Sequence, residues 1–128
     1  MKELYQTADW KKEKHVPVIT ISDQIKKDVP VSVKVEIGKE IAHPNTSEHY
    51  IGWIELLFLP EGEKFPYMVG HVSFEAHGAS TEGPNTSMVY SEPSTSFLLK
   101  TGKPGKLLAN SYCNIHGLWA SEKDIKVA

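Results

Sequence analysis

Arginine is absent from this sequence, and all fourteen basic residues are lysine. Bidentate recognition of phosphate or carboxylate by a guanidinium group is therefore excluded. The formal net charge of -2 supplies no basic field, so we expect no nucleic-acid partner. In residues 11–14 the lysines alternate with a glutamate, which disfavours a polybasic membrane patch.

Long hydrophobic runs are also missing. No stretch approaches the roughly 20 residues of a membrane-spanning helix, and residues 1–5 lack the apolar centre of a signal peptide. A single cysteine excludes an intramolecular disulfide, and a free thiol without a signal peptide fits a reducing compartment. We therefore expect a cytoplasmic protein with no membrane partner. Its 128 residues suit a single domain spanning residues 1–128.

Strand-like alternation is what the sequence does contain. Residues 31–37 alternate most cleanly, with four β-branched side chains on one face and polar side chains on the other. Six further segments have strand character: 16–21, 50–59, 68–77, 96–100, 106–112 and 124–127. Residues 60–63 read as a turn and residues 101–105 as a hairpin connection. About seven strands without a long amphipathic helix predict an all-β, single-domain immunoglobulin-like β-sandwich, with a small closed barrel as the alternative.

The lone cysteine belongs to the segment Cys-Asn-Ile-His-Gly at residues 113–117. Cys113 and His116 form a compact chelating pair, and Gly117 lets the backbone turn sharply after them. Taken alone, the pair is weak evidence for a site, because a free cysteine often behaves as a small buried hydrophobe.

Two upstream segments change this interpretation. Residues 13–17 contain His15, and residues 43–49 begin and end with His43 and His49. Four of the six histidines thus share three short segments with the only cysteine. Together they offer four nitrogens and one sulfur, with Glu13 as a nearby oxygen donor, and this set indicates a metal site.

The number and type of the candidate ligands narrow the choice of metal. Structural zinc favours four closed ligands, and five candidates exceed that number. A blue-copper site uses two histidines and a cysteine, generally with a methionine beyond the last histidine, whereas every methionine here precedes Cys113. Four imidazoles and one thiolate leave a sixth position open, which suits a redox-active non-haem iron.

The other two histidines serve as a comparison. In segment 68–77, Met68 belongs to the apolar alternation, while His71 and His77 share the opposite, polar face. We expect that face to be solvated and exclude both histidines from the metal site. Pro-Asn-Thr-Ser occurs twice, at 44–47 and 84–87, and we interpret it as generic turn chemistry.

The three metal-site segments together resemble the superoxide reductases, namely the one-iron neelaredoxin type and the iron-binding domain of desulfoferrodoxin. The resemblance covers about residues 10–119 and rests on Glu-Lys-His-Val-Pro at 13–17, His-Pro-Asn-Thr at 43–46 with His49, and Cys-Asn-Ile-His-Gly at 113–117. It implies an immunoglobulin-like β-sandwich with a square-pyramidal mononuclear iron centre. By this resemblance the ligands are four equatorial histidines and one axial thiolate: His15, His43, His49, His116 and Cys113.

The implied activity is the one-electron reduction of superoxide to hydrogen peroxide, with the iron cycling between Fe2+ and Fe3+. The resemblance implies that Lys14 attracts superoxide and that Glu13 closes the sixth position in the ferric state. We also expect backbone amides around residues 115–116 to hydrogen-bond the sulfur.

The desulfoferrodoxin type often adds an N-terminal four-cysteine iron site, which a chain with one cysteine does not form. An external electron donor, such as a rubredoxin, is therefore needed. The one-iron type also resembles homotetrameric proteins, so we expect a homo-oligomer.

Two other interpretations stay open on sequence alone. A β-sandwich that binds metal or transfers electrons without superoxide turnover would result if the sixth position were blocked or if Lys14 pointed away. A β-sandwich interaction domain with incidental histidines would require all three segments to coincide by chance.

Overall fold

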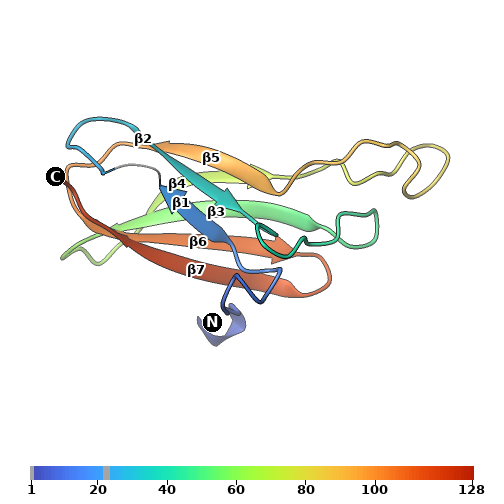
Figure 1. The fold of residues 1–128 in the computed structure, drawn as a ribbon, viewed down its shortest axis with the longest axis horizontal. Coiled ribbons are helices and arrows are strands. Elements are labelled where there is room, and N and C mark those ends of the chain that lie inside the picture. The colour runs from blue at the N-terminus through green and yellow to red at the C-terminus, as the bar shows by residue number, and fades with distance from the viewer. Residues whose placement is uncertain (1, 22–23) are drawn as a thin grey trace.

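The computed structural model describes residues 2–21 and 24–128, and strands dominate it (Figure 1). One sheet has the order β1-β2-β5, made of β1 (Val18–Ile21), β2 (Val31–Glu36) and β5 (Ser94–Leu99). The other has the order β4-β3-β6-β7, made of β3 (Ile51–Pro60), β4 (Tyr67–Ser73), β6 (Gly105–Cys113) and β7 (Gly117–Ile125). A 3-10 helix, η1 (Lys2–Leu4), lies near the N-terminus.

All strand pairs are antiparallel, and the seven strands form two sheets. This arrangement confirms the predicted β-sandwich and decides against a single closed sheet. Within the described residues, no helix has the length and apolar character needed to cross a membrane.

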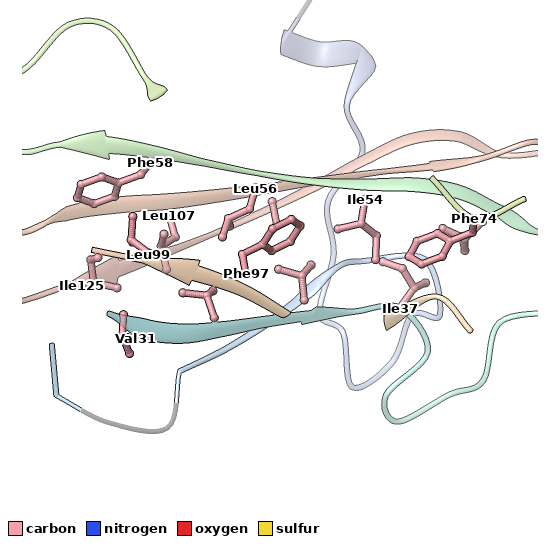
Figure 2. Close-up of a cluster of buried hydrophobic side chains, with 14 of the residues drawn as sticks. Val31, Ile37, Ile54, Leu56, Phe58, Phe74, Phe97, Leu99, Leu107 and Ile125 are labelled. Carbon is pink, nitrogen blue, oxygen red and sulfur yellow. The ribbon is translucent and has the colours of Figure 1, made fainter. Parts of the chain in front are cut away.

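The hydrophobic core fills the space between the two sheets (Figure 2). In β2 the alternation predicted from sequence is observed, with Val31, Val33 and Val35 buried and the residues between them exposed. Phe97 of β5 crosses to the opposite sheet, where its ring lies so close to Gly70 that a side chain at residue 70 would overlap it. The Phe97 ring therefore packs directly on the β4 backbone at a position that only glycine leaves open.

The last strand is longer than predicted. The sequence indicated a strand at 124–127, whereas β7 begins at Gly117 and pairs with β6 along its whole length, from Cys113–Gly117 to Gly105–Ile125. Its first five residues are all partly buried, so the alternation that marks a half-buried strand is missing. Backbone pairing, not side-chain periodicity, defines this strand.

The prediction of a hairpin at residues 101–105 is wrong. This segment connects β5 in one sheet to β6 in the other, so it crosses between the layers. The hairpin next to it in the sequence is instead β6–β7, whose turn lies at residues 114–116. Turn-forming residues mark both kinds of connection, and they do not reveal which sheet receives the next strand.

The predicted alternation of segment 68–77 is interrupted by a β-bulge in β4. Leu56 pairs with Gly70, but Leu57 pairs with Met68, so Val69 is the extra residue. The bulge turns Val69 toward the core and leaves Met68 55% exposed, contrary to the predicted apolar position. The strand also ends at Ser73, before His77.

Candidate metal centre

The five predicted ligands come from three connections at one end of the sandwich. His15 lies in the segment before β1, and His43 and His49 lie in the connection between β2 and β3. Cys113 is the last residue of β6, and His116 lies in the tight turn to β7. The turn closes at Gly117, whose φ of 78° lies in the left-handed region that favours glycine.

The four imidazole rings surround one point. Neighbouring ring centroids are 4.7–5.1 Å apart around the circuit His15, His43, His49, His116. The diagonal from His15 to His49 is longer, 6.4 Å, as expected for a square arrangement. Cys113 Sγ lies 3.5 Å from His43 Nε2 and 3.8 Å from His116 Nδ1. Donor atoms of four residues lie within 4.8 Å of one another: His15, His43, His49 and Cys113.

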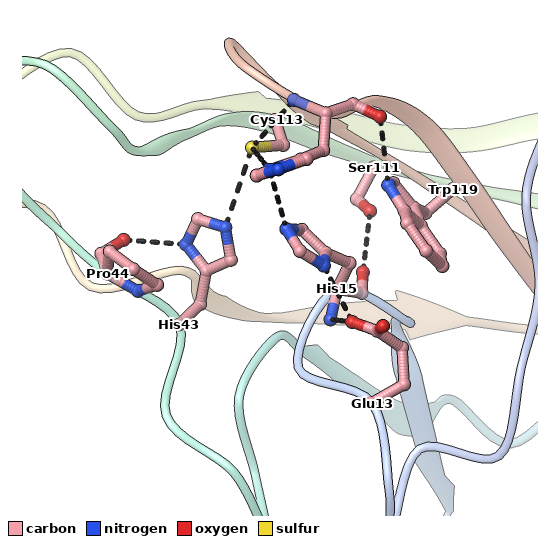
Figure 3. Close-up of polar contacts among 8 residues, drawn as sticks. Glu13, His15, His43, Pro44, Ser111, Cys113 and Trp119 are labelled. Atoms are coloured by element: carbon pink, nitrogen blue, oxygen red, sulfur yellow. Dashed lines mark hydrogen bonds and ion pairs between the residues drawn. The ribbon is translucent and has the colours of Figure 1, made fainter.

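Hydrogen bonds on the outer ring nitrogens select which nitrogen faces this point. Nδ1 of His15 contacts Glu13 Oε1 at 2.6 Å, and Nδ1 of His43 donates to the Pro44 carbonyl at 2.6 Å (Figure 3). Both rings thus keep Nε2 free for the centre. Nε2 of His49 is buried and has no hydrogen-bond partner within the described part of the chain.

A bound cation would account for two features of this geometry that are otherwise unfavourable. A buried ring nitrogen without a partner is costly in a folded protein, yet His49 Nε2 is in that position. In addition, His15 Nε2 and His116 Nδ1 approach to 3.2 Å. Imidazole nitrogens that converge with a thiol on one point are the donors that bind iron, copper or zinc. The residues present therefore fit a metal ion.

Cys113 is fully buried and lies beneath the rings as part of the core. The backbone N–H of His116 donates to its Sγ at 3.4 Å, which confirms for His116 the predicted amide contact with the sulfur. Such a bond lowers the electron density of a thiolate and tunes its strength as a ligand. His116 itself is exposed, so one candidate ligand lies at the protein surface.

Burial favours the neutral form of three of the candidate ligands. Burial lowers the pKa of His15, His43 and His49, and for His43 it does so to about 4. For His15, hydrogen bonding to Glu13 opposes part of this effect. The positive charge of Lys14 lowers the pKa of the same three rings further. Neutral imidazole is the form that binds metals, so the site is prepared for a cation near neutral pH.

Lys14 and Glu13, for which the sequence predicted roles in the reaction, interact with the imidazole rings in different ways. Lys14 is half-buried, and its charge acts on three of the four histidines. Glu13 Oε1 accepts hydrogen bonds from the backbone N–H of His15 at 2.7 Å and from its ring. Burial raises the pKa of the Glu13 carboxyl, but these hydrogen bonds outweigh it, so the net shift is downward. In this structure Glu13 thus orients His15 from outside the circle of rings (Figure 3).

Two further side chains support the site and were not predicted. The Trp119 ring stacks on His15, with centroids 4.8 Å apart and planes inclined by 14°, and its Nε1 donates to the His116 carbonyl. Asn114 contacts the backbone on both sides of His49. Both residues lie within the range of about 10–119 over which the sequence resembles the family, but long-range contacts of this kind have no local sequence pattern.

The excluded histidines do lie outside the cluster. His71 contacts Glu55 at 3.3 Å on the exposed face of β4, as predicted. His77 differs from the prediction because it is half-buried, stacked on Tyr50 with its Nε2 donating to the Phe74 carbonyl at 2.5 Å.

The two Pro-Asn-Thr-Ser segments contact each other. The Ser47 N–H donates to Asn85 Oδ1, and the Asn85 N–H donates to Ser47 Oγ. Asn85 also donates to both carboxylate oxygens of Glu48. The second segment therefore braces the loop of the first, which contains two of the candidate ligands.

Comparison with known proteins agrees with this geometry. Residues 7–122 match the family described as desulfoferrodoxin. A superoxide reductase of Pyrococcus furiosus is 61% identical, with 94% of each chain covered. Neelaredoxin of Megalodesulfovibrio gigas is 53% identical, covering 98% of this chain and 96% of its own.

A solved structure extends the similarity to the fold. Reduced superoxide reductase (neelaredoxin) from Archaeoglobus fulgidus has a TM-score of 0.91 and 61% identity, covering 96% of this chain and 98% of its own. Family membership and the cluster of histidines around Cys113 together imply a mononuclear iron site. The chain belongs to the desulfoferrodoxin family.

Proposed function

We propose that this protein is a superoxide reductase that converts superoxide to hydrogen peroxide at a mononuclear iron. The observation that supports it best is the circle of four imidazoles beside a buried cysteine, in which the buried Nε2 of His49 has no hydrogen-bond partner among the described residues. Its relatives include proteins named superoxide reductase at high identity over nearly the whole chain.

Five residues would hold the iron. His15, His43 and His49 would bind through Nε2, because their other contacts or their burial leave that atom available. His116 would bind through Nδ1, the atom that approaches His15 and the sulfur. Cys113 would bind as a thiolate whose donor strength is moderated by the His116 amide.

When bound, the iron supplies one electron to superoxide, and two protons complete hydrogen peroxide. Lys14 favours the approach of the anion, since its charge extends over the centre. The exposure of His116 gives water access to the site, so protons need no dedicated side-chain acid. Glu13 has two proposed functions: it fixes the tautomer of His15, and it would serve as a further oxygen ligand of the ferric iron.

The electron must come from another protein. The only cysteine, Cys113, is used by the proposed iron centre, so this chain has none left for a second cysteine-bound iron. A small electron carrier such as a rubredoxin is the proposed donor. We also propose that residues 1–128 act as one iron-binding domain in a cytoplasmic homo-oligomer, as the family resemblance implies.

Anaerobic purification followed by metal analysis and absorption spectroscopy tests the iron site. Stoichiometric iron is expected, and oxidation should produce a thiolate-to-iron charge-transfer band. Tightly bound zinc with no oxidation-dependent colour would instead indicate a structural site. If the iron and its band are present but superoxide does not oxidise the iron, the protein is an electron-transfer module.

A further inference from the structure

We propose that Asn114 is a positioning residue that fixes His49 relative to Cys113. The side chain of Asn114 contacts the two peptide groups on either side of His49. Its Oδ1 accepts the Tyr50 N–H at 2.8 Å, and its Nδ2 donates to the Glu48 carbonyl at 2.9 Å. One amide therefore restrains both peptide planes that set the direction of the His49 side chain.

The need for this restraint follows from the strand pairing. The β3–β6 ladder reaches its last pair at Ile51 and Cys113, after a register shift between Ile51 and Trp53. Beyond it, the Asn114 N–H still donates to the Tyr50 carbonyl at 3.2 Å, but the chain then turns toward β7. The Asn114 side chain replaces the main-chain acceptor that a continuing strand would have offered to Tyr50.

Asn114 acts on a ligand whose ring is less restrained than two of the others, although Thr46 also bonds the His49 backbone N–H and carbonyl. The outer nitrogens of His15 and His43 are fixed by Glu13 and by the Pro44 carbonyl. In the described residues the His49 ring, in contrast, makes no hydrogen bond through its outer nitrogen, and its Nε2 is buried and has no hydrogen-bond partner. Because Asn114 directly follows Cys113, it joins two ligand-bearing segments that are more than sixty residues apart in the chain.

Asn85 provides a matched control. It is also an asparagine that braces the 43–49 loop, through the Ser47 backbone and the Glu48 carboxylate. Among the described residues, Asn85 makes no hydrogen bond to the backbone of the turn after Cys113. It also makes none to the backbone of either neighbour of His49. Its φ of 57° is tolerated by glycine, so Asn85→Gly removes the brace without adding backbone strain.

The inference rests on the proposed metal site, but its test does not require superoxide turnover. We would measure the Zn2+ dissociation constant of zinc-loaded protein by competition with a chelator. Loss of an outer contact to a metal ligand typically weakens binding by about 10–100-fold, and we expect this for Asn114→Ala. Asn85→Gly removes contacts to the loop but none to the peptides that flank His49, so it should weaken zinc binding clearly less than Asn114→Ala does.

A double-mutant cycle separates positioning from general stability. In the His49→Ala background, four donors remain, which suffice for tetrahedral zinc: His15, His43, His116 and Cys113. Because Asn114 would act through His49, adding Asn114→Ala to this background should change zinc affinity by less than about twofold. An equal loss in both backgrounds, or an equal loss in Asn85→Gly, would overturn the proposal.

Amide hydrogen exchange gives a second measurement. In zinc-loaded protein, Asn114→Ala should accelerate exchange of the Tyr50 N–H while leaving the Ala109 N–H in the middle of β6 protected. Asn114→Asp keeps the acceptor for Tyr50 and loses the donor to Glu48, so it should restore Tyr50 protection and part of the affinity. Unchanged Tyr50 exchange in Asn114→Ala would also refute the proposal. Normal zinc results in a protein inert toward superoxide would refute only the proposed function.

Discussion

Lys14 offers the most direct test of how the protein attracts its anionic substrate. Lys14→Gln removes the charge and keeps a polar side chain of similar length. Lys14 is half-buried and its charge acts on three of the four imidazoles, so we expect it to act on an incoming anion as well.

The expected size of the effect follows from Coulomb's law. Opposite unit charges about 6 Å apart attract by about 0.7 kcal/mol at the dielectric constant of water and about 3 kcal/mol at an effective constant of 20. These energies correspond to factors of about 3 and about 100 in rate. Because Lys14 is neither fully solvated nor fully buried, its substitution should slow the second-order reaction with superoxide by a factor between these limits.

Pulse radiolysis of the reduced protein at several ionic strengths measures this rate. The difference between Lys14→Gln and the parent should shrink as salt rises, since the Debye length falls to about 3 Å at 1 M. Lys126→Gln changes the net charge equally, but Lys126 is exposed and follows β7 at the opposite end of the sandwich. Its substitution should leave the rate nearly unchanged. Equal rates for Lys14→Gln and the parent at low salt would remove Lys14 from the mechanism.

Three further substitutions, with Leu98→Ala as a control, test the ligand set and the core. Cys113→Ser should abolish the thiolate-to-iron charge-transfer band of oxidised protein; a retained band would show that Cys113 is not the ligand. Glu13→Ala should change the ferric spectrum while the ferrous reaction with superoxide persists, and loss of the His15 contact should speed iron release to a chelator by about 10–100-fold. An unaltered oxidised spectrum would mean that Glu13 never reaches the metal. Leu107→Ala, at a fully buried core position, should lower the free energy of unfolding by about 2–5 kcal/mol in denaturant titrations. Leu98→Ala, at a residue 76% exposed, should cost less than about 0.5 kcal/mol, and similar losses for both would contradict the assigned core.

The fold was predictable where side chains alternate between core and solvent. β2 shows this most clearly, because its valines face the core and its polar residues face water. The start of β7 was not predictable, since its first residues are partly buried on both faces. The sequence also did not predict that the segment after β5 leads to the other sheet, because turn residues do not specify which sheet receives the next strand.

The candidate site was predictable from residue types and spacing, and the structure brings all four predicted histidines around Cys113. The contacts that support the site were not predictable from the sequence. Asn114 contacts the peptides that flank His49, and Trp119 stacks on His15. Both partners lie more than sixty residues earlier in the chain, and only folding brings them together. Glu13 was predicted as a neighbour of the metal, but its contact with the outer nitrogen of His15 depends on the local backbone conformation.

Titration of the reduced, iron-loaded protein with a known amount of superoxide tests the central claim most directly. A reductase should oxidise one iron for each superoxide consumed and release hydrogen peroxide without forming oxygen. Recovery of the Fe2+ form should then require an added electron donor. Continued consumption of superoxide without a donor, accompanied by oxygen release, would contradict the proposed reaction.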